Sequence, residues 1–154
     1  MKKILLSTIT FLILQLSSYA TTNSKYDLMK TPTYLLDKRF DYKKATVNGI
    51  KIGDEISKIN SDNIKEDISD YIHMKDGSRY KIKDQTVVAI GLPPNVVKNL
   101  GINSEQKLFK IFGPHTDKRS NAVMIRYYFE KQHLNFFWNH RKSRNEHLFI
   151  GNKF

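Results

Sequence analysis

The stretch AVMIRYYFEKQHLNFFW (residues 122–138) carries the strongest structural signal in the chain. In residues 123–129 every second side chain is large and apolar, and the same alternation returns in residues 134–138. A period of two is typical of a strand that buries one face and leaves the other polar. The stretch therefore predicts two antiparallel strands joined by a short turn.

The register of this hairpin depends on its turn. A turn at Glu130 and Lys131 brings the apolar faces of both strands to the same side of the sheet, as a half-buried sheet requires. It predicts three apolar pairs across the hairpin, namely Tyr127 with Leu134, Ile125 with Phe136 and Val123 with Trp138.

Four further segments have the composition of strands. Residues 70–74 and 79–82 flank the pair Asp76-Gly77, which is a strong signal for a tight hairpin turn. Residues 86–90 follow them, and residues 146–150 come after the first hairpin. We therefore expect two three-stranded antiparallel meanders.

An internal repeat precedes the two meanders. Residues 49–59 align without gaps on residues 101–111, with glycine, isoleucine, lysine and isoleucine identical at offsets 0, 1, 9 and 10. The spacing of 52 residues is in the range where self-similarity marks a repeated supersecondary unit.

The second copy of the repeat has the signals of a helix. Asn103 can cap its N-terminus, with Gln106 completing a capping box, and Gly113-Pro114 ends it. The first copy is shorter, with Asp54 as its expected cap. Residues 94–100 predict one more helical turn.

These elements predict an α+β fold. It consists of two repeats of a short helix followed by a three-stranded antiparallel meander, with the helices on one face of the sheet. Residues 46–154 would form a single domain made of two units, 46–92 and 93–154. Residues 21–45 have mixed polarity and weak periodicity, so we expect an extended lead-in there.

The first twenty residues have the three parts of a secretory signal peptide. Two lysines follow the initiator, residues 4–14 are apolar apart from small hydroxyl residues, and Ser18-Tyr19-Ala20 has small residues where signal peptidase reads them. Cleavage after Ala20 would leave a periplasmic or secreted chain with no stable membrane anchor. An uncleaved anchor helix is the alternative, but the apolar stretch is shorter than the roughly 20 residues that span a bilayer.

The cleaved chain would be strongly basic. The signal segment holds two of the 26 basic residues and none of the 15 acidic ones, so cleavage changes the formal charge from +11 to +9. Such a charge favours an acidic partner. The chain has no cysteine, which excludes disulfides, thiolate chemistry and a lipid anchor on cysteine.

The order of these elements resembles a known unit. A glycine, a short amphipathic helix ending in Phe112-Gly113-Pro114 and three meandering strands resemble the SmpA/OmlA-type bacterial envelope proteins, which are accessory lipoproteins of outer-membrane assembly. The tandem arrangement resembles the beta-lactamase inhibitor protein family, secreted binders that present a concave sheet to an enzyme. The resemblance covers residues 46–154 and implies this architecture and a protein-binding role. The lipobox cysteine of the first group and the disulfides of the second are absent here.

Five histidines prompt a search for catalytic chemistry. Their spacing does not suit a helical zinc site, so we expect neither a metal nor another cofactor. The polar run at residues 139–147 could be a ribonuclease-like site, with His140 and His147 as acid and base. Such a run is also typical of a polar loop between strands, and no catalytic residue is assigned.

The polar face of the predicted sheet is the candidate partner-binding surface, because aromatic and arginine side chains make up protein-binding hot spots. The residues assigned to it are Arg79, Lys81, Arg126, Tyr128, His133, Asn135 and Phe137.

The leading hypothesis is an exported, non-enzymatic protein-binding module of the inhibitor or immunity-protein kind. Its partner would be an envelope or secreted protein with an acidic surface. The alternatives are a secreted basic nuclease or toxin using His140 and His147, and an envelope-assembly accessory protein. Export disfavours nucleic acid as the partner.

Overall fold

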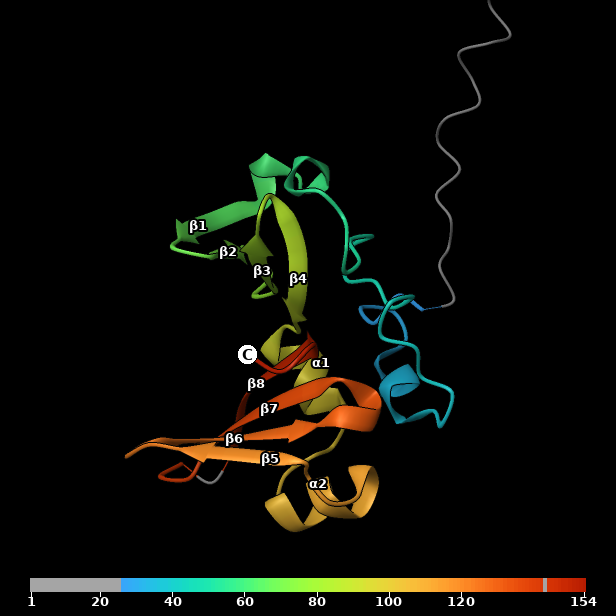
Figure 1. Cartoon of the computed structure of the whole chain (residues 1–154), viewed down its shortest axis with the longest axis vertical. Coiled ribbons are helices and arrows are strands. Elements are labelled where there is room, and N and C mark those ends of the chain that lie inside the picture. Colours follow the sequence, from blue (N-terminus) through green and yellow to red (C-terminus); the bar gives the residue numbers. More distant parts are fainter. Residues whose placement is uncertain (1–25, 143) are drawn as a thin grey trace, which may run out of the picture.

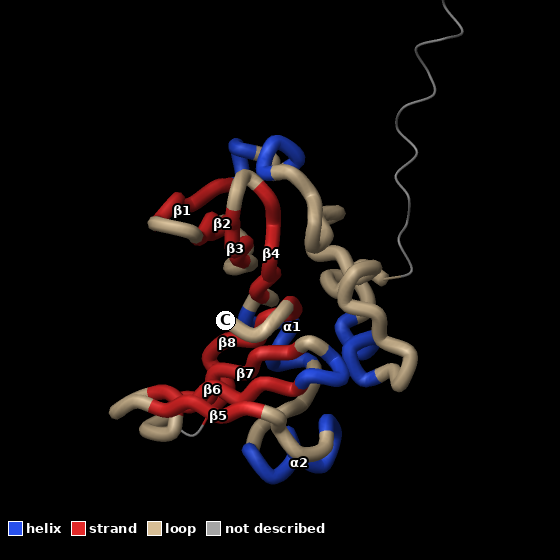
Figure 2. Tube along the Cα trace, viewed as in Figure 1, coloured by secondary structure: helices blue, strands red, loops and turns tan. Residues whose placement is uncertain are grey.

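A computed structural model describes residues 26–142 and 144–154, with the side chains of residues 144–146 left out. Strands exceed helices in this part of the chain (Figure 2), and they join into one eight-stranded antiparallel sheet in the order β1-β2-β3-β4-β8-β7-β6-β5. The strands are β1 (Ile64–Ile68), β2 (Tyr71–Met74), β3 (Arg79–Lys83), β4 (Thr86–Gly91), β5 (Asp117–Ser120), β6 (Met124–Phe129), β7 (Leu134–Asn139) and β8 (Arg144–Gly151).

The sheet consists of two meanders that meet at one junction. Strands β1 to β4 follow one another in space, as do β5 to β8, and β4 pairs with β8 between them. Figure 1 shows the two groups diverging from this junction, with the chain end marked C lying between them.

The expected fold of two helix-plus-three-strand repeats is wrong. The structure has a single eight-stranded sheet, and each meander has four strands. The α-helices of the described residues are α1 (Pro94–Asn99) and α2 (Glu105–Phe112), both in the second half of the chain. Where the first helix was expected, the structure has the 3-10 turns Ile56–Lys58 and Ser61–Asn63.

The first expected helix is missing because its ends are held extended. Glu55 forms a bridge with Thr86, the first residue of β4, and Ile56 donates its N–H to the Gln85 carbonyl. Ile59 is again extended, with ψ 123°. Only three residues remain between these points, and three residues make one 3-10 turn rather than an α-helix.

The two strands that the sequence did not predict are the sheet edges, β1 and β5. Their sequences, IKEDI and DKRS, are mostly charged and exposed, so they lack the apolar alternation that identified the other strands. Charged edge strands discourage pairing with other chains.

The β6–β7 hairpin forms with a turn later than predicted. Residues Glu130–Gln132 make a 3-10 turn, and His133 is left-handed with φ 51°. The observed pairs are therefore Phe129 with Leu134, Tyr127 with Phe136 and Ile125 with Trp138. This register differs by two residues from the predicted one. A shift of two preserves the pleat, so the same side chains still face the core.

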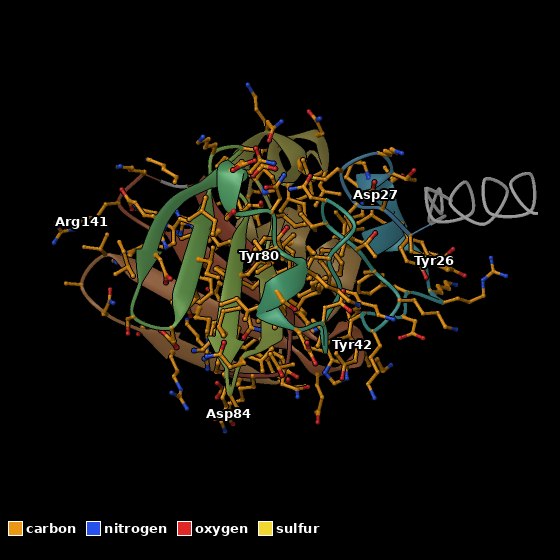
Figure 3. The ribbon with its side chains drawn as sticks, turned by 90° about the horizontal axis from the view of Figure 1, so that it is seen from above. Tyr26, Asp27, Tyr42, Tyr80, Asp84 and Arg141 are labelled. Carbon is orange, nitrogen blue, oxygen red and sulfur yellow. The ribbon has the colours of Figure 1, made fainter. Side chains whose placement is uncertain are left out.

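The core lies on one face of the sheet. Tyr80 of β3 is fully buried there, near the centre of the view in Figure 3, and its hydroxyl donates to the Val47 carbonyl at 3.0 Å. Residues of the expected lead-in are part of this core, since Leu28 and Leu35 are fully buried. The predicted signal peptide and residues 21–25 lie outside the described residues.

Helix α2 packs aromatic side chains on the same face. The Phe112 ring lies 5.6 Å from that of Phe129 and 5.2 Å from that of Phe136. Its N-cap is Ser104 rather than the predicted Asn103, and it ends at Gly113, whose φ is 78°. No helix of the described residues is long and apolar enough to cross a membrane.

A buried carboxylate fixes the turn that leads into the first meander. The Asp54 side chain is 6% exposed, and its oxygens accept hydrogen bonds from Lys58 Nζ at 2.6 Å and Lys51 N–H at 3.0 Å. Burial alone raises the pKa of this carboxyl, but these hydrogen bonds and the positive charge of Lys58 outweigh burial and hold the pKa below its usual value.

Replacing this carboxylate is expected to destabilise the fold in a pH-dependent way. Asp54→Asn should lower the free energy of unfolding by about 1–2 kcal/mol near neutral pH, because the amide loses the charged acceptor. A depressed folded pKa gives stability that is present above the unfolded pKa of about 3.9 and is lost as the pH falls through the folded value.

Urea unfolding of Asp54→Asn and the wild type across the acidic range measures this difference, which should shrink towards zero in acid. Glu66→Gln, on exposed strand β1, is the matched control and should cost little at any pH. A difference that stays constant as the pH falls would contradict the assigned role of the carboxylate.

Candidate functional site

The sheet face opposite the core presents side chains from all eight strands. Cross-strand register and two-residue alternation decide which side chains share this face. They are Glu66 and Ile68 on β1, Tyr71 and His73 on β2, Arg79 and Lys81 on β3, Ala89 and Gly91 on β4, His147 and Phe149 on β8, Asn135 and Phe137 on β7, Arg126 and Tyr128 on β6, and Asp117 and Arg119 on β5.

This face contains two adjoining hollows, of about 680 Å³ and 210 Å³. Both are lined by Tyr71, Phe137 and His147, so we treat them as one cleft. The cleft reaches from Tyr71 on β2 to Arg119 on β5, which are near opposite edges of the sheet. The sheet is therefore concave on this side.

Aromatic rings form the floor of the cleft. The Phe149 ring lies 5.7 Å from that of Phe137, 6.1 Å from that of Tyr71 and 5.5 Å from that of Phe154, all edge to face. Phe154 also stacks on Phe137, with ring centres 6.2 Å apart. Edge-to-face pairs stabilise one another by about 0.5–1.5 kcal/mol beyond the area they bury.

A glycine makes room for this floor. A Cβ atom on Gly91 would lie 2.7 Å from Phe149 Cε1 and 3.2 Å from Arg79 Cβ. Gly91 is paired with both Phe149 and Arg79 in the sheet, so the ring of Phe149 lies directly over the glycine. A larger residue at this position would push the ring out of the floor.

Basic side chains of β3 lie beside the aromatic rings. Arg79 donates from Nη1 to Nε2 of His147 at 3.2 Å. Lys81 Nζ lies 5.1 Å from the centre of the Tyr71 ring, 4.6 Å from that of Phe154, and 3.3 Å from the Asp70 carboxylate. Desolvation lowers the pKa of Lys81, but Tyr71 and Asp70 outweigh it and raise the pKa, so the ammonium is charged.

A second basic group lies at the β5–β6 side of the cleft. Arg126 is buried and donates from Nη2 to Asp117 at 2.6 Å. Asp117 also lies 3.8 Å from Arg119 Nε and 3.5 Å from Lys153 Nζ. Desolvation raises the pKa of Asp117, but Arg126 and Lys153 lower it to below its usual value. One carboxylate is thus shared by three cations.

Three of the seven predicted partner-binding residues lie at the end of this face, beside the cleft. Tyr128 and Asn135 are buried, and His133 stacks on Tyr42 with ring centres 4.0 Å apart. Asn135 Nδ2 donates to the carbonyls of Gly151 and Asn152. The chain segments before β1 and after β8 therefore cover this end of the sheet.

The other four predicted residues, Arg79, Lys81, Arg126 and Phe137, come together in or beside the cleft. Sequence reasoning missed Tyr71, Arg119, Phe149 and Phe154. Alternation along β8 could have identified Phe149, but Arg119 is on an edge strand without apolar pattern and Phe154 follows the last strand.

The histidines of the nuclease hypothesis occupy different environments. His147 lines the cleft, and its Nε2 accepts the hydrogen bond from Arg79. His140 is exposed in the turn after β7, and neighbouring Arg141 projects away from the body of the molecule (Figure 3). Across the described residues there is no group of three or more His, Cys, Asp or Glu side chains that could hold a metal ion.

Comparison with known proteins adds one weak similarity. No protein-family model matches the chain, and no curated protein matches it. The crystal structure of a DUF4309 family protein, YjgB, from Bacillus subtilis is similar with a TM-score of 0.43 and 16% identity, over 57% of this chain and 68% of that chain. A similarity of this size carries no argument about function.

The close approach at Gly91 gives a test of the cleft floor. Gly91→Ala is expected to lower the free energy of unfolding by about 1–3 kcal/mol, because its methyl group overlaps the Phe149 ring. Phe149→Leu removes the overlapping ring atoms. In a double-mutant cycle measured by chemical unfolding, the double variant should therefore lose less stability than the two single variants added together. Strict additivity would contradict this contact.

Proposed function

We propose that this chain is an exported, non-enzymatic binding protein whose cleft holds an acidic segment of a partner protein, in the manner of an inhibitor or immunity protein. The observation that carries this proposal is the chemistry of the cleft walls. Arg79, Arg119, Arg126 and Lys142 line them, and the lining side chains that the structure describes include no aspartate or glutamate. The nearest carboxylate described at the β5–β6 side, Asp117, is shared by Arg126, Arg119 and Lys153, so positive charge is in excess there.

The basic side chains and the aromatic floor of the cleft would contribute differently to binding a partner. The Arg119 side chain is 68% exposed, so it can attract and orient a carboxylate from solution. Complementary charges of this kind mainly raise the association rate and set specificity. The aromatic floor supplies the apolar area from which binding hot spots are made.

The hydrogen-bond geometry favours binding over RNA hydrolysis. The Nε2 atom of His147 already accepts from Arg79, so it would have to exchange this partner before taking a proton from a substrate. The second histidine of that hypothesis, His140, does not line the cleft.

Charge reversal in the cleft tests the proposal. Arg119→Glu, used as bait beside the wild type in extracts of secreted and envelope proteins, should lose an acidic protein that the wild type captures. With the purified pair, affinity should fall about fivefold, because a reversed charge at an exposed interface position is worth on the order of 1 kcal/mol.

Lys110→Glu is the matched control, since it makes the same charge change on α2, on the other side of the sheet. It should leave affinity unchanged. Equal losses in both variants would indicate only an effect of net charge and would count against the cleft. Cleavage of RNA or DNA by the wild type, abolished in His147→Ala, would overturn the proposal.

Export rests on the first twenty residues and has its own test. When the full chain is expressed in a bacterium with a secretory pathway, mass spectrometry should find Thr21 at the N-terminus of the exported protein. Ala20→Arg places a long charged side chain where signal peptidase needs a small one, so it should block this processing. Wild-type protein that retains residues 1–20 and stays in the cytoplasm would refute export.

A further inference from the structure

The segment Asn152–Phe154 crosses the proposed binding surface. After β8 ends, Asn135 holds the Asn152 carbonyl at 3.2 Å, Lys153 Nζ lies 3.5 Å from Asp117, and the Phe154 ring reaches the cleft floor. Figure 1 shows this end of the chain between the two halves of the sheet. The chain thus places one of its own aromatic side chains where a partner would bind.

Phe154 occupies an aromatic socket. Its ring stacks on Phe137 and meets Phe149 edge to face, with ring centres 6.2 Å and 5.5 Å away, and Lys81 Nζ lies 4.6 Å from its centre. A phenyl ring can stack on one aromatic ring, meet a second ring edge to face and attract an ammonium group to its face. The socket therefore suits an aromatic side chain.

The other socket residues are held more firmly than Phe154. Phe149 is in the middle of β8, which pairs with β4 on one side and β7 on the other, and it is 4% exposed. Phe154 follows the last strand and is only half-buried, and the Lys153 side chain that ties this segment to Asp117 is 44% exposed. Exposed ion pairs of this kind hold a segment weakly.

We infer that the partner of this cleft presents an aromatic side chain flanked by carboxylates, and that Phe154 fills the aromatic socket in the free protein as a built-in competitor. This inference rests on the proposed function. The ring of the partner would replace that of Phe154 between Phe137 and Phe149. Its flanking carboxylates would then lie near Lys81, whose Nζ is 4.6 Å from the centre of the Phe154 ring, and near Arg79, which lines the same hollow as Phe137 and Phe149.

The test compares two proteins and two probes. The probes are a short peptide of glutamate and aspartate around one central phenylalanine, and the same peptide with glycine in place of phenylalanine. The proteins are the wild type and Phe154→Ala, and calorimetric titration gives each dissociation constant. If the socket is open about a tenth of the time, Phe154→Ala should bind the phenylalanine peptide about tenfold tighter.

The glycine peptide should bind both proteins with the same, weaker affinity, because it places no ring in the socket. A second variant tests displacement directly. In Phe154→Trp the new indole should move from the socket into water when the phenylalanine peptide is added, which shifts its fluorescence to the red. The Trp138 side chain is 4% exposed on the core face and should give a constant background.

The outcomes separate the inference from the proposed function. Weaker or unchanged binding of the phenylalanine peptide to Phe154→Ala overturns the competitor role, and equal affinity of both peptides overturns the aromatic specificity. In either case, the proposed function stands if Arg119→Glu still weakens binding of the peptide. Failure of both proteins to bind either peptide counts against the acidic-partner function and the inference together.

Discussion

The pairing of β4 with β8 is the constraint on which the rest of the structure depends. It consists of three residue pairs, Ala89 with Gly151, Ile90 with Ile150 and Gly91 with Phe149, extended by a hydrogen bond from Leu92 N–H to the Leu148 carbonyl. These few contacts make one sheet from two meanders. They also bring Arg79 of the first meander beside His147 of the second.

Irregular pairing bends strands on both sides of this junction. The register shifts between Lys81 and Ile82 and between Phe137 and Trp138, one on each side of the junction. An extra residue in one strand of a pair bends that strand and increases its twist. The aromatic and basic side chains of the cleft extend from paired strands, so a partner that bound there would cost little conformational entropy.

Local patterns in the sequence predicted the strands that bury apolar side chains and the helices α1 and α2. The β6–β7 hairpin was predicted with a pairing register that differs by two residues from the observed one, yet Tyr127 and Phe136 still face the core because the pleat repeats every two residues. Strands β1 and β5 were not predicted, because these charged edge strands have no apolar alternation. The helix expected at residues 54–59 is absent because Glu55 bridges to Thr86, a contact that no local pattern reveals.

Local patterns also predicted only part of the candidate site. Alternation placed Arg126 and Phe137 on one polar face, and the structure brings both to the cleft. Alternation could not show that β4 pairs with β8, because that contact joins residues distant in the chain. The cleft between the two meanders therefore could not be predicted from the sequence pattern. Tyr128 and Asn135 share the face, but the segments that cover them come from beyond the sheet.

Both faces of the sheet carry aromatic rings, but the rings on the two faces are buried to different extents. On the core face, Phe129 and Phe136 are packed beneath α2 and are almost completely buried. On the cleft face, Phe137 and Tyr71 remain partly exposed, and the neighbouring cover that the structure describes comes from Lys81 and Phe154. A sheet centre rich in aromatic rings normally requires a second layer. Here the segment Asn152–Phe154 supplies part of that layer, and in the proposed function a partner protein would complete it.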